Sequence, residues 1–516
     1  MGGAAHRPAA EGQPDPYRFV VAWLRIHPVR MPARPRLWQA GGMADPLDDR
    51  DVAADALRRV TAAAGPYLDS LAGRKVHDAA AAGLTAALGG PLPERGLGTL
   101  PAVARLLEAG TAAATASSGP RFFHFVTGGA TPAALAADWT ASLLDQNSFA
   151  RASSAFGNDV ETIALDWLRE LFGLPPGWGG ALVASATFAN FTSLGCATHW
   201  WGERQGADTV RDGLAGLPRM PVFSSGYVHA SARKALQMLG HGRDTVRVCA
   251  RDGAGRVDLA AMARGLDALG GAPAVIIANA GEVNAGDFDP LDDLAGLARD
   301  HGAWLHVDGA FGLFAALSPA TSHLTRGIER ADSVAADAHK WLNVPYESGF
   351  ALIREPQRLG AAFGMPGAAY LPGPQDPGGG YGLYGPESSR RARALPIWAT
   401  LAAYGRSGHR AMVERHAGLA QRLARAVDEA PDLERLAEVP LCIVCFRVRP
   451  PGVAEGDLDD LNRRVGAALL ADGRVFAGTT VYDGRVALRP AIVNWRTTEA
   501  DIDLLVDVVR ELSATV

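Results

Sequence analysis

The sequence predicts an α/β fold in which a large, mostly parallel sheet follows a helical segment and precedes a smaller α+β domain. Between about residues 121 and 355, short apolar runs alternate with helical patterns, as is typical of parallel strands joined by helices. The chain has 516 residues, of which 48% are hydrophobic and 20% charged, so it can bury a large core.

The N-terminal region divides at about residue 43. Residues 1–42 are rich in proline, arginine and alanine, and we interpret them as a disordered extension or as upstream sequence included by a wrong start codon. Their apolar patch at 19–24 is too short for the core of a signal peptide. Helical periodicity begins after Met43, so we expect a helical segment over 43–120.

Seven apolar runs are candidate strands of a sheet in a large domain over 121–385. The runs cover 180–185, 221–225, 245–250, 274–279, 303–308, 333–337 and 350–353. The helical patterns that separate many of them cover 189–201, 231–240, 258–269 and 290–302.

The C-terminal part begins with a break in the pattern. Residues 365–386 are rich in glycine and proline, and we expect a long mobile loop without regular elements, of a kind that often carries function. A helical pattern follows at 389–405, and strand-like runs then alternate with helices, so 386–516 are predicted to form a small α+β domain. Cys442 and Cys445 lie in an apolar run as C-x-x-C. In a strand, residues i and i+3 face opposite sides, which argues against a metal or redox role.

Composition argues against several kinds of partner. The net charge of -5 provides no basic field for nucleic acid or an anionic membrane. No apolar run reaches the length of a membrane span. Four cysteines cannot form a disulfide framework, which favours a cytoplasmic protein.

Lysine is rare, because arginine supplies all but three of the 50 basic residues. Lys75 and Lys234 lie in helical patterns, whereas Lys340 follows the run 333–337, where a strand ends and a loop begins. Ligands of parallel sheets collect at such ends, and partial desolvation there lets an amine attack an aldehyde. Lys340 is therefore a candidate for Schiff-base formation, although its position alone also fits an ordinary surface lysine.

Two other clusters give Lys340 a context. Asp308 ends a strand in HVDGAFG (306–312), and its carboxylate could pair with a pyridinium nitrogen. The small residues Gly309 and Ala310 beside it would let a flat ring lie against the backbone. In ASATFANF (184–191), a strand leads into a helix whose N–H groups, with the hydroxyls of Ser185 and Thr187, could hold a phosphate. A phosphate site, an acidic strand end and a lysine, in this order, fit bound pyridoxal 5'-phosphate.

With these motifs, and DAHKWLNVPY around Lys340, the chain resembles the group II pyridoxal-phosphate-dependent amino-acid decarboxylases, including aromatic-amino-acid and glutamate decarboxylases, and in particular their bacterial branch. The resemblance covers about 44–512. It implies the fold-type-I transferase fold and decarboxylation of an L-amino acid to an amine and CO2 through a Lys340 Schiff base. The alternatives are an aminotransferase or a decarboxylating aldehyde synthase on this fold, or a non-catalytic cofactor-binding protein. Arg489 could bind the α-carboxylate in an aminotransferase, but the decarboxylases have a matching arginine, so it does not distinguish the two.

The resemblance also assigns roles within the cofactor site. Asp308 would keep the pyridine nitrogen protonated, while Ala310 and His229 would contact opposite faces of the ring. Ala186 and Thr187 would hold the phosphate, and His339 would line the site. The implied cofactor-binding residues are Ala186, Thr187, His229, Asp308, Ala310, His339 and Lys340.

Two positions depart from the family pattern. Val283 stands where the aromatic decarboxylases place a threonine near the ring hydroxyl, and Asn284 is the nearest polar substitute. Asp337 stands where they have an asparagine close to the phosphate. Since a carboxylate facing a phosphate would repel it, we expect Asp337 to point away or to bond to the backbone.

Substrate contacts are implied at three positions. In the family, segments like 121–132 and 143–154 reach the pocket, the second of them from the partner subunit, which implies a homodimer with shared active sites. Phe125, Asn147 and Phe149 fall at these positions, and Asn147 suggests a polar contact because it replaces an apolar residue.

A tyrosine on a mobile loop completes the implied site. In the family it protonates Cα after CO2 departs, and a phenol is a suitable neutral donor at pH 7. The candidates here are Tyr370, Tyr381 and Tyr384. Tyr384 fits the spacing of the bacterial relatives and Tyr381 that of the aromatic decarboxylases, so the choice between them stays open.

Overall fold

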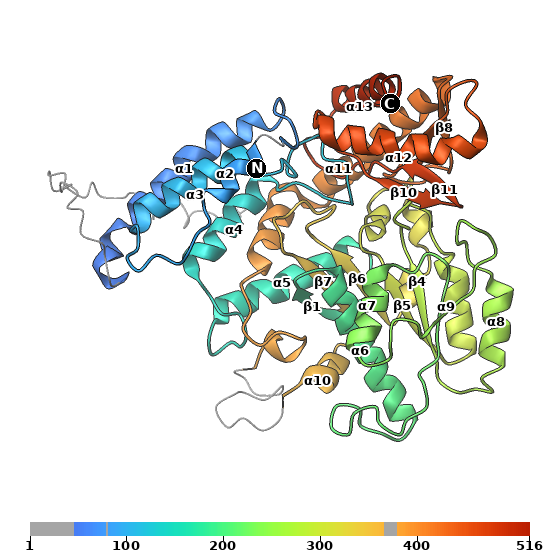
Figure 1. The fold of residues 1–516 in the computed structure, drawn as a ribbon. Helices are drawn as coiled ribbons and strands as arrows, with labels where there is room; N and C mark the ends of the chain where they lie inside the picture. Colours follow the sequence, from blue (N-terminus) through green and yellow to red (C-terminus); the bar gives the residue numbers. More distant parts are fainter. Residues whose placement is uncertain (1–45, 79–80, 366–378) are drawn as a thin grey trace, which may run out of the picture.

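The computed structural model describes residues 46–78, 81–365 and 379–516. The predicted extension over 1–42, most of the Gly/Pro-rich loop and the candidate Tyr370 lie outside these ranges. The described chain forms a large sheet domain, a smaller sheet domain and a set of N-terminal helices (Figure 1).

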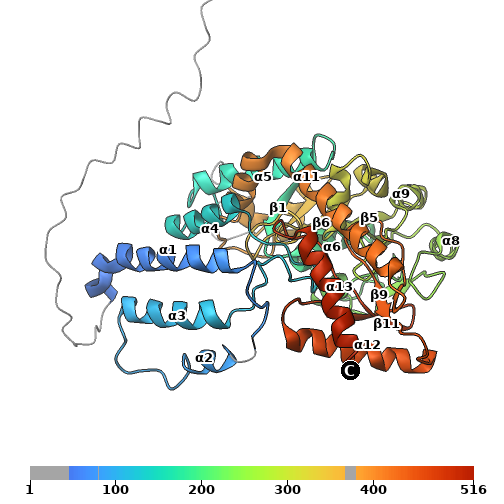
Figure 2. The same cartoon turned by 90° about the horizontal axis from the view of Figure 1, so that it is seen from above.

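The N-terminal helices form an arm beside the main body (Figure 2). A 3-10 helix (Pro46–Val52) leads into α1 (Ala53–Ser70), which is followed by α2 (Ala82–Ala86) and α3 (Thr99–Ala113). None of the α1 residues is buried, although α1 packs along α3. The arm therefore has apolar surface that this chain does not cover.

All seven predicted runs form strands of one sheet. The strand order is β1-β7-β6-β5-β4-β2-β3; β7 runs antiparallel to both neighbours and every other pair is parallel, which confirms the fold class. The strands are β1 (Gly179–Val183), β2 (Val222–Ser224), β3 (Val246–Val248), β4 (Val275–Asn279), β5 (Trp304–Asp308), β6 (Ser333–Asp337) and β7 (Gly349–Ile353).

Helices surround this sheet and bury most of its strands (Figure 1). They are α4 (Pro132–Leu144), α5 (Ala155–Leu171), α6 (Ala186–Arg204), α7 (Ala230–Met238), α8 (Leu259–Asp267), α9 (Leu291–Asp300) and α10 (Gln357–Phe363). Because β4, β5 and β6 are parallel and adjacent, their carboxyl ends lie together, and Asn279 is directly opposite Asp308.

The C-terminal part has its own core and a four-stranded antiparallel sheet in the order β10-β11-β9-β8. Helix α11 (Ala394–Glu429), interrupted at Gly405 (φ 59°), packs its first part into the large core and its last part into the small one. The remaining elements are β8 (Leu433–Arg435), β9 (Phe446–Val448), α12 (Glu455–Asp472), β10 (Thr479–Tyr482), β11 (Arg485–Leu488) and α13 (Glu499–Ser513).

The apolar run at 441–448 is a continuous strand only from Phe446. Before that point Ile443 makes a single bridge to Ala491, so Cys442 and Cys445 are not on a shared strand as expected. Both thiols are free and buried, and burial raises their pKa values, that of Cys445 to about 12. A buried thiol with a raised pKa is poorly suited to redox chemistry.

No helix in the described ranges is both long and apolar enough to cross a bilayer. Within the same ranges, no group of three or more His, Cys, Asp or Glu residues is arranged to hold a metal ion.

Candidate active site

A cavity at the carboxyl ends of β4 and β5 brings four of the predicted site residues together. They are His229, Asp308, Ala310 and Lys340, which come from three separate parts of the chain. The other residues that line this cavity are Val126, Tyr227, Asn279, Gly281, Glu282, Val283 and Phe311.

Lys340 is held by the acidic residue one turn before it. Its Nζ lies 2.9 Å from Asp337 Oδ2, and the lysine side chain is 19% exposed. Asp337 Oδ1 accepts the backbone N–H of Ala186 and lies 3.4 Å from His339 Nε2. Asp337 therefore bonds to the backbone, as expected, and the group it contacts is one of those predicted to hold a phosphate.

The start of α6 is suited to an anion. Ser185 precedes the first helical residue, and its side chain makes no capping hydrogen bond, so the hydroxyl remains free for a ligand. Thr187 is half-buried in the first turn. Gly349 on β7 passes so close that a Cβ there would lie 2.6 Å from the Ser185 carbonyl carbon, so glycine is required. The N–H groups and the positive end of the helix dipole both favour a phosphate here.

Asp308 is a buried carboxylate with no cationic partner among the described residues. Its side chain accepts Asn190 Nδ2–H at 2.9 Å and the Ala310 backbone N–H at 3.2 Å, and the residue is only 5% exposed. A buried negative charge needs a positive partner, and a protonated pyridine nitrogen would supply one. The residues of this cavity therefore fit pyridoxal 5'-phosphate.

His229 lies at the opening of the cavity, where it caps α7. Its Nδ1 accepts the backbone N–H of Ser231 at 3.2 Å. Partial burial of the ring lowers the pKa of His229 below 6.5, and Asp308 partly opposes this shift. At neutral pH the ring is therefore neutral, with its proton on Nε2.

The predicted substrate residues do not line this cavity. The Phe125 side chain is 63% exposed, with its backbone at φ 55°, and the neighbouring Val126 contacts the cavity instead. Arg489 donates to the Phe125 carbonyl at 2.6 Å and also to the Val283 carbonyl, so it holds two cavity segments together. Its guanidinium has a structural role in this chain.

Asn147 and Phe149 support the Gly/Pro-rich loop. Asn147 Oδ1 accepts the backbone N–H groups of Phe149 and Arg390, each at 3.1 Å. The Phe149 side chain is buried against Leu383, and a Cβ on Gly382 would lie 2.0 Å from the Phe149 ring. Phe149 thus anchors this end of the loop.

Tyr381 and Tyr384 also lie outside the cavity. The expected absence of regular structure is wrong for Tyr381–Leu383, which forms a 3-10 helix because the loop packs against Phe149. The Tyr381 hydroxyl lies 2.9 Å from Thr162 Oγ1, and burial raises the pKa of Tyr381 to about 12. The Tyr384 ring meets that of Tyr381 edge-on at 5.8 Å, and its hydroxyl makes no hydrogen bond within the described residues.

Several residues of the site were missed by sequence reasoning. Tyr227 lines the cavity and donates to Asp287 Oδ2 at 2.6 Å. Tyr346 stacks on the His339 ring with centroids 4.3 Å apart. Tyr227 stands two residues before His229, and Tyr346 ends the segment DAHKWLNVPY around Lys340, so closeness in sequence to these residues was the available signal. Asn190 also lies in a motif, ASATFANF (184–191), but nothing in that motif indicates which of its polar residues faces Asp308.

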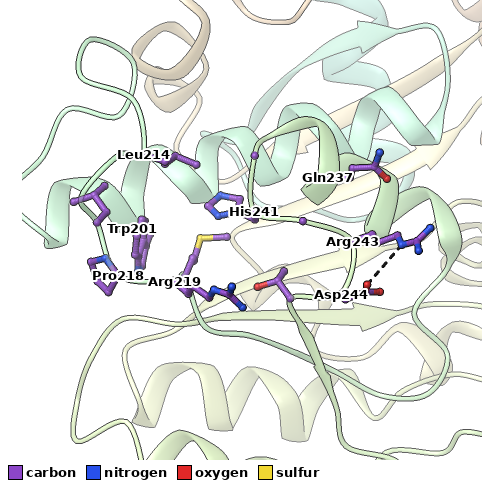
Figure 3. A pocket seen from close by; sticks show the side chains of 13 residues that line it. Trp201, Leu214, Pro218, Arg219, Gln237, His241, Arg243 and Asp244 are labelled. Carbon is purple, nitrogen blue, oxygen red and sulfur yellow. Dashed lines mark ion pairs between the residues drawn. The ribbon is translucent and has the colours of Figure 1, made fainter.

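A wider cleft of about 580 Å³ lies elsewhere, between the segment after α6 and the turn after α7 (Figure 3). Its lining includes Trp201, Arg219, His241 and Arg243, and none of the predicted site residues. His241 is occupied by Thr198 Oγ1 at 2.9 Å, so we do not assign the chemistry to this cleft.

Residues 106–449 match the model of a protein family described as the pyridoxal-dependent decarboxylase conserved domain. The chain belongs to the pyridoxal-dependent decarboxylase family. Its activity is pyridoxal-phosphate-dependent decarboxylation of an amino acid, as predicted, and the alternatives are not favoured.

Relatives of this decarboxylase act on several kinds of amino acid, as their names state. It is 31% identical to an aromatic-L-amino-acid decarboxylase of Bacillus atrophaeus over 390 residues, covering 74% of this chain and 79% of that protein. It is 30% identical to an L-2,4-diaminobutyrate decarboxylase of Rhizobium meliloti (strain 1021), covering 82% and 83%. The crystal structure of Oryza sativa TDC with PLP and tryptamine shares the fold, with a TM-score of 0.84 and 24% identity over 92% of this chain and 99% of that one.

Proposed function

We propose that the substrate of this decarboxylase is an aromatic L-amino acid. The main support is the lining of the cavity beside the cofactor-binding residues. There, apolar and aromatic contacts come from Val126, Tyr227, Val283 and Phe311. Such a lining favours an aromatic side chain through apolar burial and ring packing. The 31% identity to the Bacillus atrophaeus enzyme supports the same choice.

The charged groups near the cavity do not favour an acidic or a basic substrate. Glu282 lines the cavity, but its two carboxylate oxygens accept the backbone N–H groups of Asn284 and Ala285, each at 2.7 Å. Burial raises the pKa of Glu282, which weakens it as a partner for a cation. Apart from Lys340, no Arg or Lys among the described residues lines the cavity, so an acidic side chain lacks a partner.

A panel of aromatic, acidic and basic L-amino acids tests this proposal, with CO2 and amine measured together. We expect one amine per CO2 and a kcat/KM for tryptophan, tyrosine or phenylalanine at least about tenfold above that for glutamate or 2,4-diaminobutyrate, because the latter pair leave a charge unpaired in the cavity. A preference for glutamate or 2,4-diaminobutyrate would contradict the proposed substrate while leaving the decarboxylase activity intact.

The side chains of this cavity divide the work of the reaction. When bound, pyridoxal 5'-phosphate supplies a ring that accepts the electron pair left as CO2 departs. Lys340 would present its amine to the cofactor, Asp308 would hold the proton on the ring nitrogen and His229 would cover a ring face. Ala186 and Thr187, at the start of α6, would hold the phosphate, and Ala310 would contact the ring. His339 keeps Asp337 in place beside the lysine amine.

We also propose a homodimer with shared active sites. The α1 helix buries no residue in its own chain, and an apolar groove of about 250 Å³, lined by Val60, Tyr67, Leu107 and Trp139 among others, runs between α1, α3 and α4. Large side chains such as Leu143 are exposed nearby. The arm in Figure 2 would bury this surface against a second copy.

The position of the loop supports sharing. Phe149, Tyr381 and Tyr384 pack together and none of them lines the cavity that contains Lys340. The described end of the loop, which does not line the cavity of its own chain, can complete the site of a partner. Asn147 and Phe149 would then act by holding the loop in position, and Phe125, which is exposed, would meet the partner or the substrate at the mouth of the site.

Mixing inactive variants tests this sharing. Lys340→Ala dimers lack the amine and Phe149→Ala dimers lack the loop anchor, but a hybrid dimer has one site with both intact. After subunit exchange at equal amounts, we expect recovery of up to about a quarter of wild-type activity, since half of the dimers are hybrids with one complete site.

The matched control is a mixture of Lys340→Ala with Asp308→Ala, which should recover nothing because both residues belong to the same chain's cavity. If the first mixture also stays inactive after exchange is verified by mass spectrometry, the sites are not shared.

Tyr384 is the proposed proton donor to Cα. Its hydroxyl is free within the described residues, whereas that of Tyr381 is bonded to Thr162. Loop closure would bring the phenol to Cα and exclude water. We expect Tyr384→Phe to bind substrate normally but to yield less amine and more aldehyde or inactivated cofactor, because Cα stays unprotonated for longer and oxygen or misplaced protonation intercepts it.

Product analysis with Tyr381→Phe as the control decides between the two tyrosines. A normal amine yield from Tyr384→Phe together with a changed yield from Tyr381→Phe moves the role to Tyr381. Unchanged products from both variants would remove the role from this part of the loop.

We further propose a cytoplasmic location, which the four free cysteines support, since exposure to an oxidising compartment favours disulfides.

We also propose the predicted division into an N-terminal helical segment, a large domain and a small domain, with the boundary between the two cores within α11.

A further inference from the structure

The polar side chains behind Asp308 form one continuous series of hydrogen bonds. Trp304 Nε1 lies 3.0 Å from Ser333 Oγ, and Ser333 Oγ lies 2.9 Å from His306 Nδ1. His306 Nε2 lies 2.8 Å from Asn190 Oδ1, and Asn190 Nδ2 lies 2.9 Å from Asp308 Oδ2. All five residues are buried, so water does not compete for these bonds.

Only one direction of hydrogen-bond donation along the series is compatible with both Trp304 at one end and Asp308 at the other. The indole N–H of Trp304 can only donate, so Ser333 accepts it and gives its own hydrogen to His306 Nδ1. An ionised Asp308 can only accept, so Asn190 turns its NH2 toward it and its oxygen toward His306. The proton of His306 is therefore on Nε2, and burial lowers the pKa of His306 to about 4, which keeps the ring neutral.

The second N–H of Asn190 extends the series to His229. Asn190 Nδ2 lies 3.2 Å from Ser231 Oγ, and Ser231 Oγ lies 2.7 Å from His229 Nδ1. Since Ser231 accepts from Asn190, its hydroxyl hydrogen is directed to His229 Nδ1. This bond, with the Ser231 backbone N–H, makes Nδ1 an acceptor and leaves the His229 proton on Nε2.

We propose that Asn190 and His306 are positioning residues for the decarboxylation: one amide orientation, set by His306, directs an N–H donor to the Asp308 carboxylate and keeps His229 in its Nε2–H form. Hydrogen bonds donated to a carboxylate stabilise its charged form, and that charge is what holds a proton on the ring nitrogen of the cofactor. The inference rests on the family activity and is independent of the proposed aromatic substrate.

Two substitutions of His306 separate this role from packing. In His306→Gln the amide can donate to Asn190 and accept from Ser333, so the direction of the hydrogen bonds is preserved. The leucine of His306→Leu fills the space but can neither donate nor accept a hydrogen bond. With 15N-labelled pyridoxal 5'-phosphate bound, we expect the ring-nitrogen shift of wild type and His306→Gln to report a protonated nitrogen. In His306→Leu the shift should move to the unprotonated value as pH rises, and kcat should fall about 10- to 100-fold with KM within about threefold.

The matched control is His241→Leu, since His241 is also a neutral histidine of the large domain, half-buried and with a pKa lowered to about 4, but lies outside the cavity. It should leave the 15N shift and kcat unchanged. If His306→Leu does not fold, Asn190→Asp gives the same test, because this isosteric change replaces the donating NH2 with a second carboxylate oxygen. A wild-type 15N shift and kcat in the folded variant would overturn the proposal, as would equal losses in His306→Gln and His306→Leu with an unchanged shift.

Discussion

Lys340→Ala is expected to abolish both turnover and the yellow absorbance of the bound cofactor. Lys340 contributes the amine of the cavity, and the other two lysines of the chain, Lys75 and Lys234, do not line it. Without the amine the cofactor can be held only through its phosphate and ring contacts. We expect activity below about one thousandth of wild type, measured as CO2 release together with the visible spectrum.

Lys234→Ala is the matched control for this prediction. Lys234 lies on α7 one turn after His229, so its loss tests whether any lysine near the site is sufficient. The control should keep wild-type turnover and absorbance. Activity in Lys340→Ala above a few per cent of wild type would show that the site has been assigned to the wrong lysine.

Asp308→Ala is expected to bind the cofactor but to lose nearly all of the rate. The hydroxyls of Ser185 and Thr187 at the start of α6 remain available for the phosphate, so binding survives. The ring nitrogen, however, loses the carboxylate that keeps it protonated, and the ring becomes a poor electron acceptor. We expect kcat to fall by about 10²- to 10⁴-fold while the cofactor still co-purifies or rebinds.

A control for loss of a partly buried carboxylate is Asp332→Ala, which removes an acceptor for the Leu305 N–H and the partner of Arg354 at the start of β6, away from the cavity. This change should lower stability but leave kcat per folded enzyme unchanged. Wild-type turnover in Asp308→Ala would mean that protonation of the ring nitrogen is not part of the mechanism.

The sheet and the ends of its strands could be predicted because strands buried on both faces appear as continuous apolar runs. The run 333–337 coincides with β6, and 303–308 differs from β5 by one residue. Lys340 and Asp308 follow from the same pattern, since parallel neighbouring strands bring their carboxyl ends together.

The side-chain partners could not be predicted, because they depend on helix rotation and on contacts between distant segments. Asn190 is one of several polar residues in α6, and only its packing against β5 shows that it faces Asp308. The bond of Tyr381 to Thr162 and the packing of Phe149 on the loop join segments far apart in the sequence. The contact of Asp337 with the lysine amine likewise requires the folded turn.

The most direct test of the account is to locate the cofactor on the chain. The holoenzyme is treated with borohydride, which makes the link between the cofactor and an amine permanent, and the labelled peptide is identified by mass spectrometry. We predict one pyridoxyl group per chain, on Lys340. A label on Lys75 or Lys234, or no label on a chain that releases CO2 from an amino acid, would contradict the assignment of the active site.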